Sequence, residues 1–147
     1  MMLWVTRHEP HVDRCASIWL IKNLIDKDAV FEFISRDSEI PKDAIAFTLP
    51  KAELKPTEDQ TTFDFLVQRY MIDDPIVFQI GQIIRDFEKD ADEDIDKVKL
   101  KESVGVYLIL RGLARTSKSD HEIIHKAMIV MDSLYAQLTA RQKGETE

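Results

Sequence analysis

Apolar residues are arranged along this chain in two patterns, one typical of short strands and one typical of helices. Residues 3–5 and 30–34 are short apolar runs, and 30–34 is rich in the β-branched and aromatic residues that favour strands. Residues 44–48 are a candidate third strand. A buried helix is predicted between the first two runs, so the first 34 residues suggest a small βαβ unit with a right-handed crossover if the strands are parallel.

Helix signals dominate the rest of the chain. The first helix is apolar almost all round, which is typical of a central, buried helix that ends near Asp26. The helix that follows Asp74-Pro75 shows one apolar stripe with a period of 3.6 residues, and the last helix also carries its apolar residues on one face. The predicted starts are Asp13 as N-cap, Thr61 or Thr62 as N-cap, Asp74-Pro75, about residue 102, and a capping box at Ser119. The expected fold class is therefore α+β, mostly helical, with about five helices and a two- or three-stranded sheet formed by the N-terminal third.

Composition limits the function classes. Residues 1–142 are expected to form one domain, followed by a polar tail over 143–147. The formal net charge is −7, which argues against direct nucleic acid binding, because such domains usually carry a basic stripe. The longest apolar run spans seven residues, at 104–110, so no membrane association is expected. A single cysteine and the absence of a signal-peptide pattern predict a cytoplasmic protein.

The segment Thr6–Arg14 has the most distinctive local chemistry. It joins a strand to the start of a helix, where free backbone amides and the positive end of the helix dipole favour an anion. Arg7, His8, His11 and Arg14 bring positive or protonatable groups to this point of an acidic chain. Cys15 follows in the first turn, where a thiol pKa can be lowered. The alternative is that Arg7 and Arg14 are paired with Glu9, Asp13 or distant acids, and that Cys15 is simply packed in the core.

Three other features have competing interpretations. Arg111 follows the apolar run and is expected to form a structural ion pair with Asp64 or Asp86, or alternatively to face a substrate. The stretch 121–125 matches the zinc motif H-E-x-x-H, but it lies in the first turn of a helix and no third histidine follows it. The acidic run 88–96 lacks the glycine and final glutamate of a calcium loop, so it is predicted to be a solvated acidic connector.

Several motifs together resemble the C-terminal domain of the chromate-resistance regulators of the ChrB type, a domain that also occurs as a free-standing protein. The specific part is the opening motif, Trp4-Val5-Thr6-Arg7 followed by His11-Val12-Asp13-Arg14 and Trp19-Leu20-Ile21. Weaker matches keep their order to about residue 138. They include Ala52-Glu53, Thr62-Phe63-Asp64, Asp74-Pro75, Leu110-Arg111-Gly112-Leu113 and Leu134-Tyr135.

The resemblance implies a role in chromate resistance or chromate-responsive regulation. In full-length relatives the presumed DNA-binding half lies N-terminal to this domain. The family pattern has a histidine near Lys55-Pro56 and a His-Asp-x-Asp stretch where this chain reads Arg85-Asp86-Phe87-Glu88. If relatives bind a divalent metal ion there, the ligands left in this chain are His11, Glu53, Asp64, Asp86 and Glu88.

Three functions follow as hypotheses. The first is binding or sensing of a chromate-like oxyanion, or of an associated metal, with Arg7, His11, Asp13, Arg14 and Arg111 as ligand-binding residues. The second is an enzyme that uses a metal at His11 or a redox thiol at Cys15. The third is an interaction module, in which the helix carrying Met128, Met131 and Tyr135 exposes an apolar patch to a homodimer or to a separate DNA-binding protein.

Overall fold

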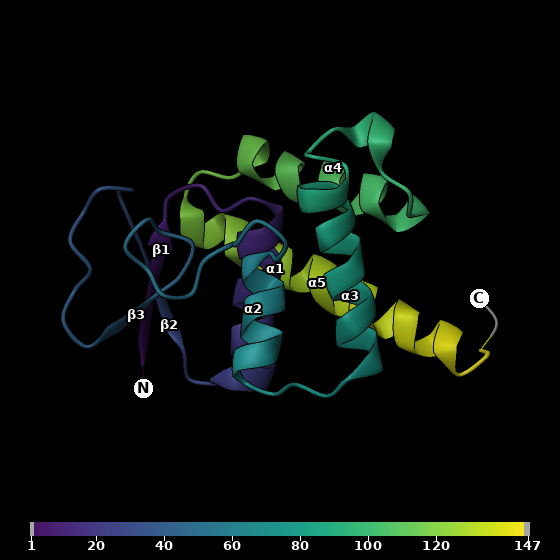
Figure 1. Cartoon of the computed structure of the whole chain (residues 1–147), viewed down its shortest axis with the longest axis horizontal. Coiled ribbons are helices and arrows are strands. Elements are labelled where there is room, and N and C mark those ends of the chain that lie inside the picture. The colour runs from purple at the N-terminus through teal and green to yellow at the C-terminus, as the bar shows by residue number, and fades with distance from the viewer. Residues whose placement is uncertain (1, 146–147) are drawn as a thin grey trace.

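The computed structural model describes residues 2–145, and in them a small parallel sheet lies beside a layer of helices (Figure 1). Strands β1 (Leu3–Arg7), β2 (Val30–Ile34) and β3 (Ala44–Ala46) form a sheet of order β2-β1-β3. Both pairings are parallel, and Trp4 lies opposite Phe31 of β2 and Ile45 of β3. The predicted sheet is confirmed, and its third strand is shorter than the expected 44–48.

Five α-helices follow the predicted order, so the fold class is α+β and mostly helical. Their bounds are Val12–Leu20 for α1, Thr62–Arg69 for α2, Pro75–Arg85 for α3, Lys101–Thr116 for α4 and Asp120–Gln142 for α5. Two π-helical turns extend α1 and α3, η1 (Ile21–Ile25) and η2 (Asp86–Asp90), and a short 3₁₀ turn, η3 (Ile95–Lys97), follows.

Helix α1 is the centre of the fold because every other α-helix packs against it. All of its residues from Val12 to Leu20 are buried, as its apolar sequence predicted. The main core lies between the helices and one face of the sheet, where Trp4, Phe31 and Phe47 point. A smaller cluster around Val5 and Leu49 covers the opposite face, so the parallel sheet is covered on both sides.

The capping residues at the starts of three helices can be compared with those predicted from the sequence. Asp74 caps α3, accepting from the amides of Ile76 and Val77, and Pro75 is the first helical residue, as predicted. Thr61 caps α2 in a capping box with Asp64. Ser119 caps α5, but the Glu122 carboxylate accepts from the Lys118 amide, so the predicted capping box there is wrong in its second half.

The apolar face predicted to be exposed on α5 is in the core instead. Met131 has no exposed surface, and the Tyr135 hydroxyl donates to Asp74 across 2.6 Å. The Tyr135 ring also lies against Trp19 of α1, with 5.6 Å between the ring centroids. The Met128, Met131 and Tyr135 face therefore joins α5 to α1 and α3. None of the helices in residues 2–145 is both long and apolar enough to cross a bilayer.

Candidate functional site

The loop between β1 and α1 is held by a buried cation. Arg14 is 3% exposed, and its guanidinium donates to the carbonyl oxygens of Arg7, of His8 at 3.1 Å and of Glu9 at 2.6 Å. Burial and the nearby Arg7 lower the Arg14 pKa to about 10, so the side chain remains charged at neutral pH. From the other side, Asp120 of α5 accepts the Glu9 amide at 2.8 Å. Glu9 is thereby fixed in the left-handed region, with φ of 54°.

Asp13 caps a different helix from the one predicted. The N-cap of α1 is His11, whose side chain makes no capping hydrogen bond. The Asp13 carboxylate instead accepts from the amides of Thr62 at 2.9 Å and Phe63 at 3.0 Å, the first two residues of α2. The prediction that Asp13 caps its own helix is wrong because two free amides of α2 lie within its reach.

The predicted ligand-binding residues of the opening motif separate into two cavities. Arg7 lines a cavity of about 310 Å³, here called the sheet-edge cavity. His11 lines a second cavity of about 190 Å³ together with Arg111, here called the helix-start cavity. Arg14 and Asp13 line neither cavity, and their side chains are hydrogen-bonded within the protein.

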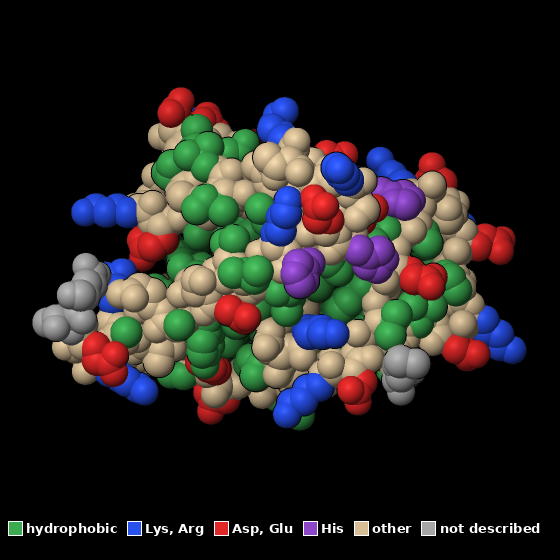
Figure 2. Space-filling view, turned by 180° about the vertical axis from the view of Figure 1, so that it is seen from behind, with side chains coloured by type: hydrophobic (Ala, Val, Ile, Leu, Met, Phe, Trp, Pro, Cys, Tyr) green, Lys and Arg blue, Asp and Glu red, His purple; other side chains and the backbone are tan. Residues whose placement is uncertain are grey.

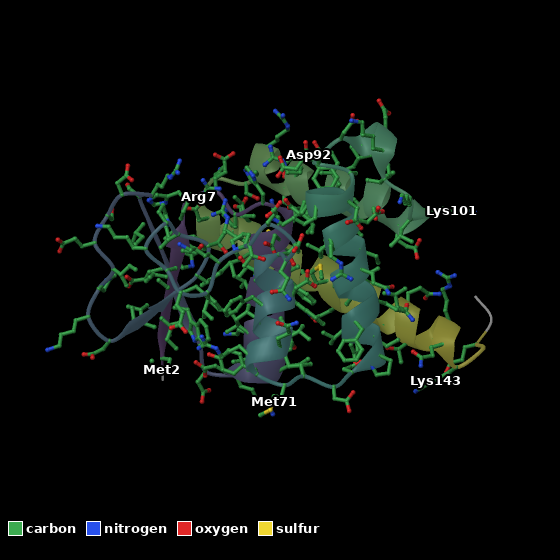
Figure 3. All side chains as sticks on the ribbon, viewed as in Figure 1. Met2, Arg7, Met71, Asp92, Lys101 and Lys143 are labelled. Carbon is green, nitrogen blue, oxygen red and sulfur yellow. The ribbon has the colours of Figure 1, made fainter. Side chains whose placement is uncertain are left out.

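The sheet-edge cavity lies where the carboxyl ends of the strands meet. Figure 3 shows Met2 and Arg7 at opposite ends of β1, with Arg7 at its carboxyl end. Arg36 comes two residues after β2, and Thr48 comes two residues after β3. The complete lining is Arg7, Arg36, Thr48, Leu49, Pro50, Lys55 and Pro56. Ligands of parallel sheets bind outside the carboxyl ends of the strands, which is this position.

This cavity is strongly positive for an acidic protein. Its lining contains three cations, Arg7, Arg36 and Lys55, and no carboxylate. Within the part of the chain that the structure describes, none of the three forms an ion pair. The Lys55 ammonium donates to the Pro50 carbonyl at 2.8 Å, which fixes its position at the rim. Thr48 has a φ of 54°, a strained conformation for a β-branched residue, and such strain is often found at functional sites.

The helix-start cavity contains ionisable groups with displaced pKa values. Its lining is His11 and Val12 of α1, Phe87 and Glu88 of η2, Glu93 of the connector, and Tyr107 and Arg111 of α4. Burial, followed by repulsion from Arg111 and Arg14, lowers the His11 pKa to about 4. Burial, followed by repulsion from Asp13, raises the Glu88 pKa to about 8. At neutral pH the histidine is therefore neutral and Glu88 is mostly protonated.

Arg111 does not form the ion pair that its sequence context predicted. Asp64 is paired with Arg85 at 2.6 Å. Asp86 is buried and accepts from the Leu100 amide at 2.8 Å and the Ser103 hydroxyl at 2.7 Å. Burial opposes ionisation of Asp86, yet these hydrogen bonds outweigh it and hold its pKa below the usual value. Arg111 Nη1 is buried without a hydrogen-bond partner among residues 2–145.

The carboxylates named as metal ligands lie apart. Glu53 is paired with Arg69, Asp64 with Arg85, and Asp86 accepts from the Leu100 amide just before α4. Of the named carboxylates, Glu88 is the one that lines the helix-start cavity together with His11. In residues 2–145 no three side chains of His, Cys, Asp or Glu gather closely enough to hold a metal ion. Arg85, one of the positions where the resemblance led us to expect a metal-binding histidine, forms an ion pair with Asp64.

The H-E-x-x-H stretch is a surface feature of α5. Histidine side chains gather on the face seen in Figure 2. His121 and His125 line a separate cavity with apolar neighbours that include Ile18 and Phe31. Glu122 is bonded to the Lys118 amide and to the Lys126 ammonium, both at 3.1 Å. The motif therefore stabilises the first turn of the helix.

The thiol of Cys15 is buried and is harder to ionise than its place in the first turn of α1 suggested. The side chain is 1% exposed, and its sulfur lies 3.5 Å from the Pro10 carbonyl oxygen. Burial raises the pKa of the thiol to about 12. Of the two possibilities for Cys15, the structure agrees with simple packing, because loss of water at this position outweighs the effect of Arg14 on the thiol pKa.

Sequence reasoning missed several residues of the two cavities, among them Phe87 and Tyr107 of the helix-start cavity. It also missed the charged or hydrogen-bonding residues Arg36, Thr48 and Lys55 at the sheet edge, and Glu93, which was counted with the solvated connector. The connector prediction holds for Asp90, Asp92 and Asp96, which are exposed, and fails for Glu88. A usable signal was present for Arg36, because it follows the predicted strand 30–34 by two residues, and for Thr48, because it ends the candidate strand 44–48.

Comparisons with known proteins agree with the opening motif. Residues 4–138 match the family model described as ChrB, C-terminal domain. The protein ChrB of Cupriavidus metallidurans is 28% identical over 141 residues, which are 95% of this chain and 42% of that protein. The chain thus spans about two fifths of the length of this curated relative. No solved structure matches. Because the family model covers nearly the whole chain, the protein belongs to the family of ChrB C-terminal domains, which is a chromate-resistance family.

Proposed function

We propose that this domain binds a small tetrahedral oxyanion dianion of the chromate type at the sheet-edge cavity, in the cytoplasm. The observation that carries the proposal is the grouping of Arg7, Arg36 and Lys55 around one cavity whose lining has no carboxylate, in a chain with a net charge of −7. A dianion entering this cavity would meet attraction from three sides.

The hydrogen-bonding groups suit an oxyanion. Arginine presents a planar fork of N–H donors that matches two oxygens of a tetrahedral anion, and charge-assisted hydrogen bonds are stronger than neutral ones. Arg7 and Arg36 come from the ends of neighbouring strands, whose pairing places Arg7 opposite Ile34, two residues before Arg36. The Thr48 hydroxyl bonds to Thr62 at 2.8 Å, so it supports the wall of the cavity.

Arg14 contributes to this proposed site indirectly. Its guanidinium holds the carbonyls of Arg7, His8 and Glu9, which fixes the backbone from which the Arg7 side chain extends. The helix-start cavity is a poorer place for a dianion because Glu88 and Glu93 line it. Of the five ligand-binding residues expected from the sequence, Arg7 is therefore the one kept as a direct ligand.

Titration calorimetry with sulfate and chromate tests the proposal. We expect each of Arg7→Gln and Arg36→Gln to raise the dissociation constant about tenfold, since one lost charge-assisted hydrogen bond contributes about 1.4 kcal/mol or more. Arg115→Gln is the matched control, because this exposed arginine on α4 also carries one charge but lies outside the cavity. Affinity should fall as salt is added.

Two results would contradict the oxyanion proposal. One is the absence of heat and of any thermal stabilisation with millimolar sulfate or chromate. The other is a double variant, Arg7→Gln with Arg36→Gln, that binds as tightly as Arg115→Gln. Sulfate is included because it has the charge and shape of chromate without being an oxidant, which separates binding from redox chemistry.

A further inference from the structure

The helix-start cavity contains an arginine whose hydrogen-bonding capacity is not used by the protein. Arg111 lines the cavity, and its Nη1 is buried without an acceptor among the described residues. A buried donor left without a partner lowers the stability of the fold, and more so when it is charged. Folds rarely keep such a group unless it meets an acceptor in some state of the protein.

The cavity joins that cation to an apolar wall. The rings of Phe87 and Tyr107 lie 4.2 Å apart between centroids, and Val12 lines the same space. The volume of about 190 Å³ is below the range of drug-sized ligand pockets, so it suits a molecule of a few heavy atoms. A cationic fork beside an apolar wall matches the two parts of a short-chain organic acid, its carboxylate and its hydrocarbon chain.

We propose that the helix-start cavity binds a small monocarboxylate, held at its carboxylate by Arg111 and along its hydrocarbon part by Phe87 and Tyr107. This site is separate from the sheet-edge cavity and does not depend on oxyanion binding there. A single negative charge fits because one permanent cation lines the cavity, and Glu93 would repel any further negative charge.

Glu88 makes the expected binding depend on pH. Four charged or titratable groups line the cavity together with Glu88: His11 at the N-cap of α1, Glu93 from the connector, and Tyr107 and Arg111 from α4. Asp13 of α1 is near enough to Glu88 to raise its pKa by repulsion. While Glu88 is protonated it adds no negative charge and offers a hydroxyl donor. Its pKa is raised to about 8, so ionisation above that pH would place a repelling charge beside the ligand. His11, with a pKa lowered to about 4, stays neutral throughout this range.

Titration of the ¹⁵N-labelled whole protein with propionate, followed through its backbone amide resonances, tests the proposal. We expect saturable shifts around Val12, Glu88 and Arg111, and no comparable shifts with propionamide, which has the same shape without the charge. Arg111→Gln should raise the dissociation constant at least tenfold, whereas Arg115→Gln, one helical turn further along α4, should leave it unchanged.

The pH dependence of propionate binding is tested with Glu88→Gln, which keeps the shape of the protonated side chain. Wild-type affinity should fall severalfold between pH 7 and pH 9, and Glu88→Gln should bind equally well at both. If Arg111→Gln does not fold, Arg111→Lys replaces it, and its ammonium should bind propionate more weakly than the guanidinium fork. Equal shifts with propionate and propionamide, or unchanged propionate binding in the Arg111 variant, would overturn the proposal.

Discussion

Asp13→Ala should lower the free energy of unfolding by about 3 to 5 kcal/mol at pH 7, because the Asp13 carboxyl group accepts from three buried donors and a buried donor that loses its acceptor costs about 1 to 3 kcal/mol. The carboxylate accepts from the Thr62 and Phe63 amides and from the Ser17 hydroxyl. Without it, the first two amides of α2 have no acceptor in a buried position. Urea unfolding followed by circular dichroism measures the change.

Two variants make this result specific to the cap. Asp13→Asn keeps one acceptor oxygen of similar size, so its loss should be clearly smaller than that of alanine. Asp37→Ala removes an exposed acid and should change stability by no more than about 0.5 kcal/mol. A loss below about 1 kcal/mol in Asp13→Ala, relative to Asp37→Ala, would show that Asp13 does not hold α2 in place.

Glu88→Gln should stabilise the protein by about 2 to 3 kcal/mol at pH 7, because each unit of pKa shift corresponds to about 1.4 kcal/mol. In the folded protein, burial and repulsion from Asp13 raise the Glu88 pKa from 4.5 to about 8. Below pH 4.5 both the folded and the unfolded state bind the proton, so Glu88 does not change the free energy of unfolding. Between pH 4.5 and 8 the unfolded chain releases it and the folded protein keeps it, so wild-type stability falls as pH rises.

The measured quantity is the difference in free energy of unfolding between Glu88→Gln and the wild type. It should be near zero at pH 4, grow up to about pH 8 and then stay constant, as followed by unfolding in urea at several pH values. Asp90→Asn serves as the control, because Asp90 belongs to the same turn η2 and is exposed. A difference that does not change with pH would show that Glu88 ionises normally in the folded protein.

Much of the fold could be predicted because its signals are local. Asp74-Pro75 starts α3 as expected, since an acidic cap and a proline act only on the adjacent turn. The strand β2 lies where a short run of β-branched and aromatic residues predicted it. The apolar residues of α1 correctly indicated a helix surrounded by the rest of the fold, because a helix without a polar face has to be covered on all sides.

The candidate site was less predictable because it depends on which elements meet. The segment Thr6–Arg14 was singled out from the sequence for its concentration of basic and protonatable side chains. Its side chains point to different places, however, since Arg7 ends a strand and His11 starts a helix. Arg36 and Lys55 reach Arg7 only through the pairing of β1 with β2 and the return of the chain after β3. No pattern within one element contains that information.

The sequence by itself determined the family, the order of the helices and strands and most of their caps, because each of these follows from residues close together in the chain. Only the tertiary structure decided the partners of the buried charges. Asp13 caps a helix 49 residues away, Arg14 holds carbonyls of the preceding loop, and Glu88 is drawn from an acidic run into a cavity. Burial then determined the pKa values of these groups, since removal of water shifts a pKa by an amount that depends on every element packed around the group.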